Sequence, residues 1–133
     1  MKLNRILCGV DFSETSVRAF ESAVSLARAF DAELHVVHVV EADLAGLSVE
    51  AKAVSAMDVL LAPALETLPS SRLTSEVTTG RGAAEILNCA RERHSDLIVL
   101  GSKGITLLEE TVFGRTSERV VKEAPCSVLI VRA

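Results

Sequence analysis

The chain has 133 residues, which suits one domain with a core of two or three layers and argues against a second domain. Hydrophobic residues make up 49% of it, yet it holds only four Phe and no Tyr or Trp, so the core must be aliphatic, as in buried parallel strands packed under helices. The net charge of −4, without a long run of one sign, disfavours non-specific binding to nucleic acid or to an anionic membrane.

The cysteines and the distribution of apolar residues indicate the cellular compartment. The three cysteines, Cys8, Cys89 and Cys126, are odd in number, widely spaced and without a C-x-x-C pattern. This predicts neither a disulfide framework nor a zinc site and favours buried, reduced thiols. The start of the chain reaches Asp11 and Glu14 before any apolar segment typical of a signal peptide, and no apolar run approaches the roughly 20 residues of a membrane span. We therefore expect a cytoplasmic protein.

The first half of the chain alternates between short β-favouring runs and stretches with helical periodicity. Ser13 is a good N-cap for the first helix, and Pro63 is expected to bend or break the second. The predicted strands are 5–10 and 33–40, and the predicted helices are 13–30 and about 49–68. The residues expected to line one side of the second helix are Val54, Met57, Leu61, Ala64, Leu65 and Leu68.

The second half continues the same alternation. Residues 72–79 alternate between apolar and polar side chains, which is typical of a strand with one exposed face at a sheet edge. Residues 96–101 form an unbroken apolar run, which indicates a central strand buried on both faces. A helix is predicted at 82–94 and a last strand at 126–131. Before that strand we expect a short helix whose inward residues are Ser117, Val120, Val121 and Ala124.

The order of these elements, βαβαβαβαβ, predicts a single α/β domain over residues 1–133. Its three layers would be a five-stranded parallel sheet with helices on both faces. In open sheets of this kind, ligands bind outside the carboxyl ends of the strands, where the winding direction reverses. Asp11 follows the first strand and Gly101 ends the fourth, so we expect these two residues to be neighbours at such a site.

Residues 101–117 carry the main candidate motif. Gly101 and Gly104 form a G-x-x-G pair, and after nine further residues Gly114 is followed by Arg-Thr-Ser. Glycines at a strand-to-helix junction let backbone N–H groups approach a phosphate, and the start of a helix adds a partial positive charge. Neither the P-loop pattern G-x-x-x-x-G-K-[ST] nor a G-x-G-x-x-G after the first strand is present. From the residues alone, turn glycines and a phosphate cradle are about equally supported.

The spacing of these glycines, placed between the fourth and fifth strands, closely resembles the nucleotide-binding motif of the universal stress protein family. The resemblance covers nearly the whole chain, through "GVDFSE", "HVV", "GRGAAEIL", "SDLIVLGSKG" and "SERVVKEAPCSVLIV". It implies a Rossmann-like fold of the adenine nucleotide alpha hydrolase type. It also implies binding of an adenine nucleotide, with ATP first, ADP or AMP as alternatives, and Mg²⁺ as a candidate companion ion.

The resemblance further implies roles for individual positions. Asp11 would face the adenine or ribose, and the backbone near Gly9 and at Val39 would help to enclose the base. Leu100 and Gly101 would close over the sugar. Such roles fit elementary chemistry, because a carboxylate accepts hydrogen bonds from amino and hydroxyl groups and helix-start amides donate to anionic oxygens. The positions that would hold the phosphates are Gly104, Gly114, Arg115, Thr116 and Ser117.

Some of these residues have competing interpretations. The ATP-binding pattern usually has Ser or Thr directly after the third glycine, whereas this chain has Arg115, whose guanidinium could bind phosphate or fill the cradle. Asp11 could instead cap the helix that follows it. His35 and His38 lie three residues apart on a strand and point to opposite faces, so we expect no metal ion shared between them.

Three functional hypotheses follow. The first is a regulatory stress-response module that binds a nucleotide without fast turnover. The second is a slow ATP-hydrolysing enzyme, although no dedicated base or metal-ligand cluster is evident in the sequence. The third is a nucleotide-free protein that dimerises or docks a protein partner. The family resemblance implies homodimers formed through strand 126–131, and an uncovered apolar edge strand has an independent physical reason to pair with its copy. We adopt the first hypothesis together with dimerisation.

Overall fold

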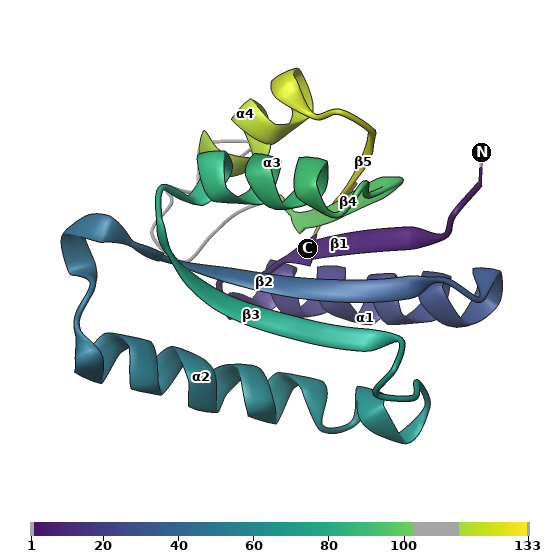
Figure 1. Ribbon diagram of the computed structural model, residues 1–133, viewed down its shortest axis with the longest axis horizontal. Helices are drawn as coiled ribbons and strands as arrows, with labels where there is room; N and C mark the ends of the chain where they lie inside the picture. Colours follow the sequence, from purple (N-terminus) through teal and green to yellow (C-terminus); the bar gives the residue numbers. More distant parts are fainter. Residues whose placement is uncertain (1, 103–114, 133) are drawn as a thin grey trace.

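A computed structural model of the protein describes residues 2–102 and 115–132. Its centre is one parallel sheet with the strand order β3-β2-β1-β4-β5 (Figure 1). All predicted strands are confirmed, and their ends lie within one residue of the prediction. The strands are β1 (Arg5–Gly9), β2 (Glu33–Glu41), β3 (Leu73–Gly80), β4 (Leu97–Gly101) and β5 (Ser127–Val131).

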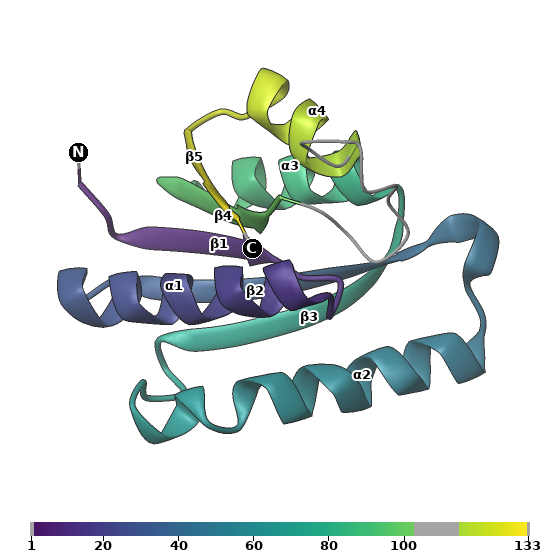
Figure 2. The same cartoon turned by 180° about the vertical axis from the view of Figure 1, so that it is seen from behind.

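Helices cover both faces of the sheet, which confirms the three-layer α/β prediction. α1 and α2 lie against one face and α3 and α4 against the other, as the two opposite views show (Figures 1 and 2). In the described ranges the α-helices are α1 (Glu14–Phe30), α2 (Leu47–Leu61), α3 (Gly82–Glu92) and α4 (Arg115–Glu123). The short 3₁₀ helices are η1 (Ala42–Leu44) and η2 (Ala64–Glu66).

Local sequence explains where α1 begins and ends. Ser13 has an extended backbone and its side chain accepts a hydrogen bond from the Ser16 N–H at 3.4 Å, which confirms the predicted N-cap. The helix stops at Phe30 because Asp31 takes up the left-handed conformation, with φ of 57°. Small residues on the buried side let the helix pack closely on the sheet. They are Ala19, Ala23 and Ala27.

The second helix differs from the prediction in its length and in its buried side. α2 ends at Leu61, and Pro63 separates it from η2, so the break expected at the proline is confirmed. Val54 and Leu65 were expected to face inward, but they are 49% and 45% exposed. The prediction was wrong because the sheet covers only a narrow stripe of the helix, at an i, i+4, i+8 spacing. That stripe consists of Ala53, Met57 and Leu61.

The last helix shows the same kind of error. Ser117 and Val120 are buried in α4, as predicted, whereas Val121 is 48% exposed. Residues one apart on a helix lie about 100° from each other, so a short helix on a sheet buries only one of the two valines. Periodicity alone located the helix but not its exact orientation.

The central strands fill the core on both sides of the sheet. Leu7 and Ile98 are buried toward α3 and α4, and Cys8 and Val99 are buried toward α1 and α2. This confirms that residues 96–101 form a central strand. β3 lies at one end of the strand order, which confirms the edge position predicted for 72–79. Among the described helices, none combines the length and the apolar character that a bilayer crossing requires.

Candidate functional site

The carboxyl ends of β1 and β4 lie side by side at the middle of the sheet. Cys8 of β1 pairs with Val99 of β4. From this pair the strands continue outward in opposite directions, through β2 and β3 on one side and β5 on the other. Such a reversal of winding is where open parallel sheets bind ligands. Gly101 is the last residue of β4 and Asp11 lies two residues beyond β1, and these predicted neighbours both approach Ser16 at the start of α1.

Asp11 takes part in the start of α1. Its Oδ1 accepts hydrogen bonds from the Ser13 N–H, at 3.0 Å, and from the Ser13 hydroxyl. Its own N–H donates to the Ser16 hydroxyl oxygen at 3.3 Å. Between them, Phe12 has a positive φ of 65°. Ser13 and not Asp11 caps the helix, but Asp11 still has a structural role, because its carboxylate holds the N-cap residue at the switch point.

Gly101 has a packing role that sequence reasoning did not assign. A Cβ at this position would lie 2.7 Å from the Ser16 backbone nitrogen and 2.7 Å from the Thr15 carbonyl carbon. These are backbone atoms, so they cannot move away without displacing the helix. The absence of a side chain lets the first turn of α1, with its partial positive charge, lie against the end of β4.

Three of the predicted nucleotide-binding residues belong at least partly to the protein core. Leu100 is only 4% exposed, and a Cβ at Gly9 would lie 2.7 Å from Leu100 Cδ2 and 3.0 Å from Ile86 Cδ1. Gly9 and Leu100 thus pack together beneath α3, and Val39 is half-buried on the same side. The buried side chain of Leu100 is therefore not available to a ligand at this edge.

The start of α4 is attached to the end of β4. The Ser117 hydroxyl is buried and donates to the Gly101 carbonyl oxygen at 2.8 Å. Arg115 is exposed, and Thr116 is half-buried next to the start of α3. Of the predicted phosphate-binding residues, these three are described and lie at the carboxyl edge. Gly104 and Gly114 lie outside the described residues.

Glu41 is a polar residue at the same edge that the sequence analysis did not single out. Its Oε1 accepts a hydrogen bond from the Gly82 N–H, the first residue of α3, at 3.1 Å. A Cβ at Gly82 would lie 3.1 Å from that oxygen and 3.2 Å from Thr116 Oγ1. The signal that could have found it is the one that singled out Asp11, a carboxylate at the carboxyl end of a strand. Starts of three helices, α1, α3 and α4, thus gather at this edge.

The two histidines of β2 contact different partners, as predicted. His38 Nδ1 lies 2.7 Å from the Val10 carbonyl oxygen, and its ring centroid lies 4.6 Å from that of Phe12. His35 points to the other face, where it contacts Thr74 and Glu76. His38 therefore supports the loop that carries Asp11, and His35 takes no part in this edge.

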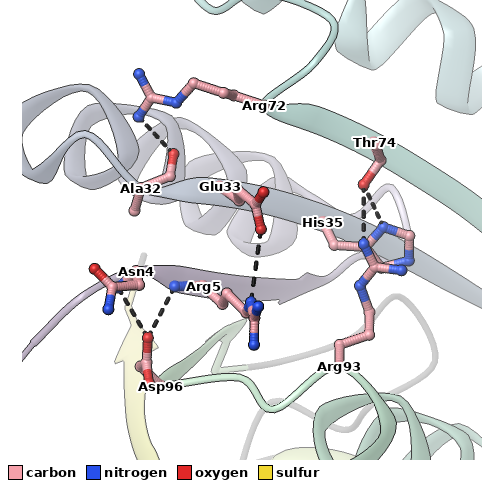
Figure 3. A network of polar contacts seen from close by, with 9 residues as sticks. All are labelled: Asn4, Arg5, Ala32, Glu33, His35, Arg72, Thr74, Arg93 and Asp96. Atoms are coloured by element: carbon pink, nitrogen blue, oxygen red, sulfur yellow. Dashed lines mark hydrogen bonds and ion pairs between the residues drawn. The ribbon is translucent and has the colours of Figure 1, made fainter.

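The amino ends of the strands form a contrasting surface. Two shallow hollows of about 340 and 380 Å³ lie there. The polar groups around them hold strands together: the Asp96 carboxylate accepts from the N–H groups of Asn4 and Arg5, at 2.8 and 2.9 Å, and Arg5 pairs with Glu33 (Figure 3). Because ligands of this fold bind at the carboxyl ends, we assign the candidate site to the opposite edge.

The sequence of the chain resembles those of known proteins. Its sequence matches the profile of the universal stress protein family over residues 2–132. The chain is a member of the universal stress protein family. A universal stress protein of Methanocaldococcus jannaschii is 32% identical, with 96% of this chain and 81% of the relative aligned. Universal stress protein YxiE of Bacillus subtilis is also 32% identical, with 97% and 99% aligned.

Solved structures of other universal stress proteins share this fold. Universal stress protein UspA from Lactobacillus plantarum is 28% identical, covers 99% of both chains and has a TM-score of 0.79. Two more distant structures, each 20% identical, were determined with nucleotides: a universal stress protein in complex with cAMP, and the Archaeoglobus fulgidus protein in complex with dAMP. Their TM-scores are 0.74 and 0.66, and each alignment covers at least 98% of both chains. The Rossmann-like fold predicted from the sequence is confirmed.

Proposed function

We propose that this universal stress protein binds an adenine nucleotide, with ATP as the first ligand to test, at the carboxyl ends of β1 and β4. The observation that carries the proposal is the convergence of Asp11, Gly101 and the start of α4 on the switch point of the sheet. The helix starts gathered there favour an anionic ligand. The cAMP and dAMP complexes of two family members add support for an adenine nucleotide.

In the proposed arrangement the base lies near Asp11, with the backbone at Gly9 and Val39 around it, and the phosphates lie toward α4. Because the Ser117 hydroxyl already donates to Gly101, Ser117 would offer its backbone N–H rather than its side chain. The exposed guanidinium of Arg115 would replace the hydroxyl that the family pattern usually has there and form a charge-assisted contact to phosphate. Leu100 would contribute only backbone. Gly104 and Gly114 complete the proposed cradle.

We propose a regulatory, stress-response role rather than fast turnover. Phosphoryl transfer needs a held metal ion and an oriented nucleophile. In the part of the chain that the structure describes, the His, Cys, Asp and Glu side chains close enough to share a metal ion are His35, Glu76 and Cys89, which lie under α3 and not at this edge. Mg²⁺ would then arrive with the nucleotide.

The test is calorimetric titration of nucleotide-stripped protein with ATP, ADP and AMP, each with and without Mg²⁺. Asp11→Asn keeps an oxygen that can accept from Ser13 but removes the charge, so the cap survives and nucleotide affinity falls about 10- to 100-fold. Asp58→Asn, an exposed carboxylate on α2, is the matched control and leaves affinity unchanged. Absence of binding at millimolar ligand would refute the proposal, and a phosphate-release assay on the same samples measures turnover.

We also propose that the protein forms a homodimer through residues 126–131. Among the described strands, β5 lies at the edge of the sheet and has β4 as its one neighbour. Its side chains are incompletely covered, with Leu129 38% exposed and Val128 and Ile130 half-buried. An apolar edge strand of this kind is shielded when it pairs with a second copy.

Light scattering and sedimentation test the dimer. We expect a dimer for the native chain and a monomer for Leu129→Lys, because the charge would have to be buried in the interface. Val59→Lys, at a 76% exposed position on α2, is the control and leaves the dimer intact. A native chain that sediments as a monomer contradicts this part of the proposal.

The predicted cytoplasmic location remains a proposal. It is supported by the three cysteines, which are all free thiols, with Cys8 and Cys89 buried and Cys126 half-buried. Burial raises the pKa of the Cys8 thiol to about 12, so this group is inert at neutral pH. Fractionation of the native source, with detection of the protein in each fraction, tests the location.

A further inference from the structure

A cluster of three side chains lies beneath α3, away from the carboxyl ends of β1 and β4. His35 of β2, Glu76 of β3 and Cys89 of α3 offer a nitrogen, an oxygen and a sulfur atom that all lie within 4.8 Å of one another. His35 Nε2 is 2.9 Å from Glu76 Oε1, and Cys89 Sγ is 3.3 Å from the same oxygen. We propose that this cluster is a binding site for a divalent transition-metal ion of the zinc class.

Two of the three distances are close to those of tetrahedral coordination, and the third, between His35 Nε2 and Cys89 Sγ, is at most 4.8 Å. Zinc bonds of about 2.0 Å to nitrogen and oxygen and about 2.3 Å to sulfur, at tetrahedral angles, separate the ligand atoms by roughly 3.3–3.6 Å. The pairs at 2.9 and 3.3 Å therefore need to separate by only a few tenths of an ångström. A set of one imidazole, one thiolate and one carboxylate matches the ligands that zinc takes in proteins.

Burial also suits an ion with one open position. His35 and Cys89 are each 7% exposed, so their positions are held by the surrounding core. The Glu76 side chain is 44% exposed, which leaves room for a water molecule as the fourth ligand. His35 also lines the hollow of about 380 Å³ at the amino ends of the strands.

Charge balance favours a divalent ion. A carboxylate can only accept hydrogen bonds, so in the metal-free protein Glu76 Oε1 accepts hydrogen bonds from both His35 Nε2–H and Cys89 Sγ–H. When the ion binds, the thiol proton of Cys89 is released to solvent and the His35 proton moves from Nε2 to Nδ1. The charge of a divalent cation is then matched by one thiolate and one carboxylate, and the guanidinium of Arg93, which reaches Thr74 beside the cluster, adds one positive charge.

Neighbouring groups orient the imidazole for this role. With a metal on Nε2, the His35 proton resides on Nδ1, which lies 2.7 Å from Thr74 Oγ1 (Figure 3). Arg93 donates to the same hydroxyl oxygen at 3.4 Å. A metal-bound histidine commonly donates its other ring N–H to such a partner, and loss of that partner weakens metal binding roughly 10- to 100-fold. Thr74 is therefore a positioning residue.

The test uses the full chain, reduced and stripped of metal by a chelator, with Co²⁺ as a spectroscopic probe. We expect one Co²⁺ per chain, with the visible absorption of tetrahedral cobalt and a thiolate charge-transfer band, and displacement by stoichiometric Zn²⁺. Cys89→Ser abolishes the charge-transfer band, whereas the thiol control Cys126→Ser retains it. Thr74→Val weakens Co²⁺ binding about 10- to 100-fold.

Substitution of the buried Cys89 could disturb folding. Glu76→Gln is a second variant that should fold normally, because the Glu76 side chain is partly exposed. It is expected to weaken Co²⁺ binding at least tenfold while the circular dichroism spectrum stays native. The proposal is overturned by binding only at a large excess of metal, by a spectrum unchanged in Cys89→Ser, or by native affinity in folded Glu76→Gln.

Discussion

The carboxyl edge of β1 and β4 and the cluster beneath α3 are two polar regions assembled in different ways. At the edge, most residues lie near a strand end or at the start of a helix; Gly101 ends β4, and Asp11 follows β1 by two residues. In the cluster, three side chains come from the interiors of β2, β3 and α3. The edge could therefore be located from the order of elements, whereas the cluster could not.

The cluster, unlike the edge, depends on the register between β2 and β3. His35 pairs with Thr74, and Val37 pairs with Glu76, so His35 and Glu76 are diagonal neighbours on one face of the sheet. A shift of one residue would move Glu76 to the opposite face, away from α3. The edge tolerates such a shift, because the carboxyl ends of parallel strands remain at one side of the sheet whatever their exact register.

The largest expected effect is that a substitution in one region weakens the binding of one ligand and leaves the other ligand's binding unchanged. Asp11→Asn should lower ATP affinity by about 1.5–3 kcal/mol and leave Co²⁺ binding unchanged. Glu76→Gln should do the reverse, since it removes a metal ligand far along the chain from Asp11. Calorimetry with ATP and optical titration with Co²⁺ measure both affinities in both variants. If either variant weakens both ligands, the two regions are coupled and the comparison fails.

Gly101→Ala tests whether the edge depends on close helix packing. The new Cβ would meet the backbone of Thr15 and Ser16 at 2.7 Å, so α1 must shift, at a cost of about 1–3 kcal/mol in the free energy of unfolding. Urea denaturation measures this loss. Gly46→Ala is the matched control, because among the described residues, its two chain neighbours aside, no atom lies within 4 Å of the new Cβ. Equal stability of the two variants would contradict the packing role.

Ser117→Ala separates a structural hydroxyl from one that binds a ligand. The variant loses the bond to the Gly101 carbonyl, so we expect a loss of about 0.5–1.5 kcal/mol in unfolding free energy. Its ATP affinity should fall much less than that of Asp11→Asn. Ser25→Ala, which removes an exposed hydroxyl bonded within α1, is the control for stability. A large loss of ATP affinity in Ser117→Ala would show instead that the hydroxyl contacts the phosphates.

The smallest effect is a dependence of stability on pH that arises from the cluster. Burial lowers the pKa of His35 below its ordinary value of 6.5, although the hydrogen bond to Glu76 opposes this. Below 6.5 the unfolded chain therefore takes up a proton that the native state resists, and stability falls as the pH is lowered from 7 through this range.

Glu76 adds to the same trend at more acidic pH. Its hydrogen bond from His35 lowers the pKa of this carboxyl below 4.5, so its contribution to stability is lost as the pH falls through the native pKa. Urea denaturation of metal-free protein between pH 7 and 5 checks the effect of His35. His35→Gln should flatten the slope in this range, and an unchanged slope would assign the dependence to other groups.

Most of the fold could be predicted from local patterns. Apolar runs and turn residues located every strand to within one residue, and Ser13 and Pro63 marked a helix start and a helix break. The errors concern which side of a helix is buried, as at Val54 and Val121. Hydrophobic periodicity identifies an amphipathic helix, but its rotation is set by the surface against which it packs.

The sequence predicted that Asp11 and Gly101 are neighbours, but it did not predict the contacts that hold them. The sequence placed Asp11 and Gly101 at one edge because strand ends follow from the order of elements. It could not show that Gly101 admits the first turn of α1, or that the Ser117 hydroxyl donates to Gly101, because these contacts join segments that are distant along the chain.

By itself, then, the sequence determined the alternation of strands and helices, the family and the edge at which a ligand is expected, since each follows from local periodicity and short motifs. The tertiary structure alone decided the sides on which α2 and α4 are buried and the meeting of His35, Glu76 and Cys89. The physical reason is that register and helix rotation are set by packing between segments far apart in the chain, which no local pattern encodes.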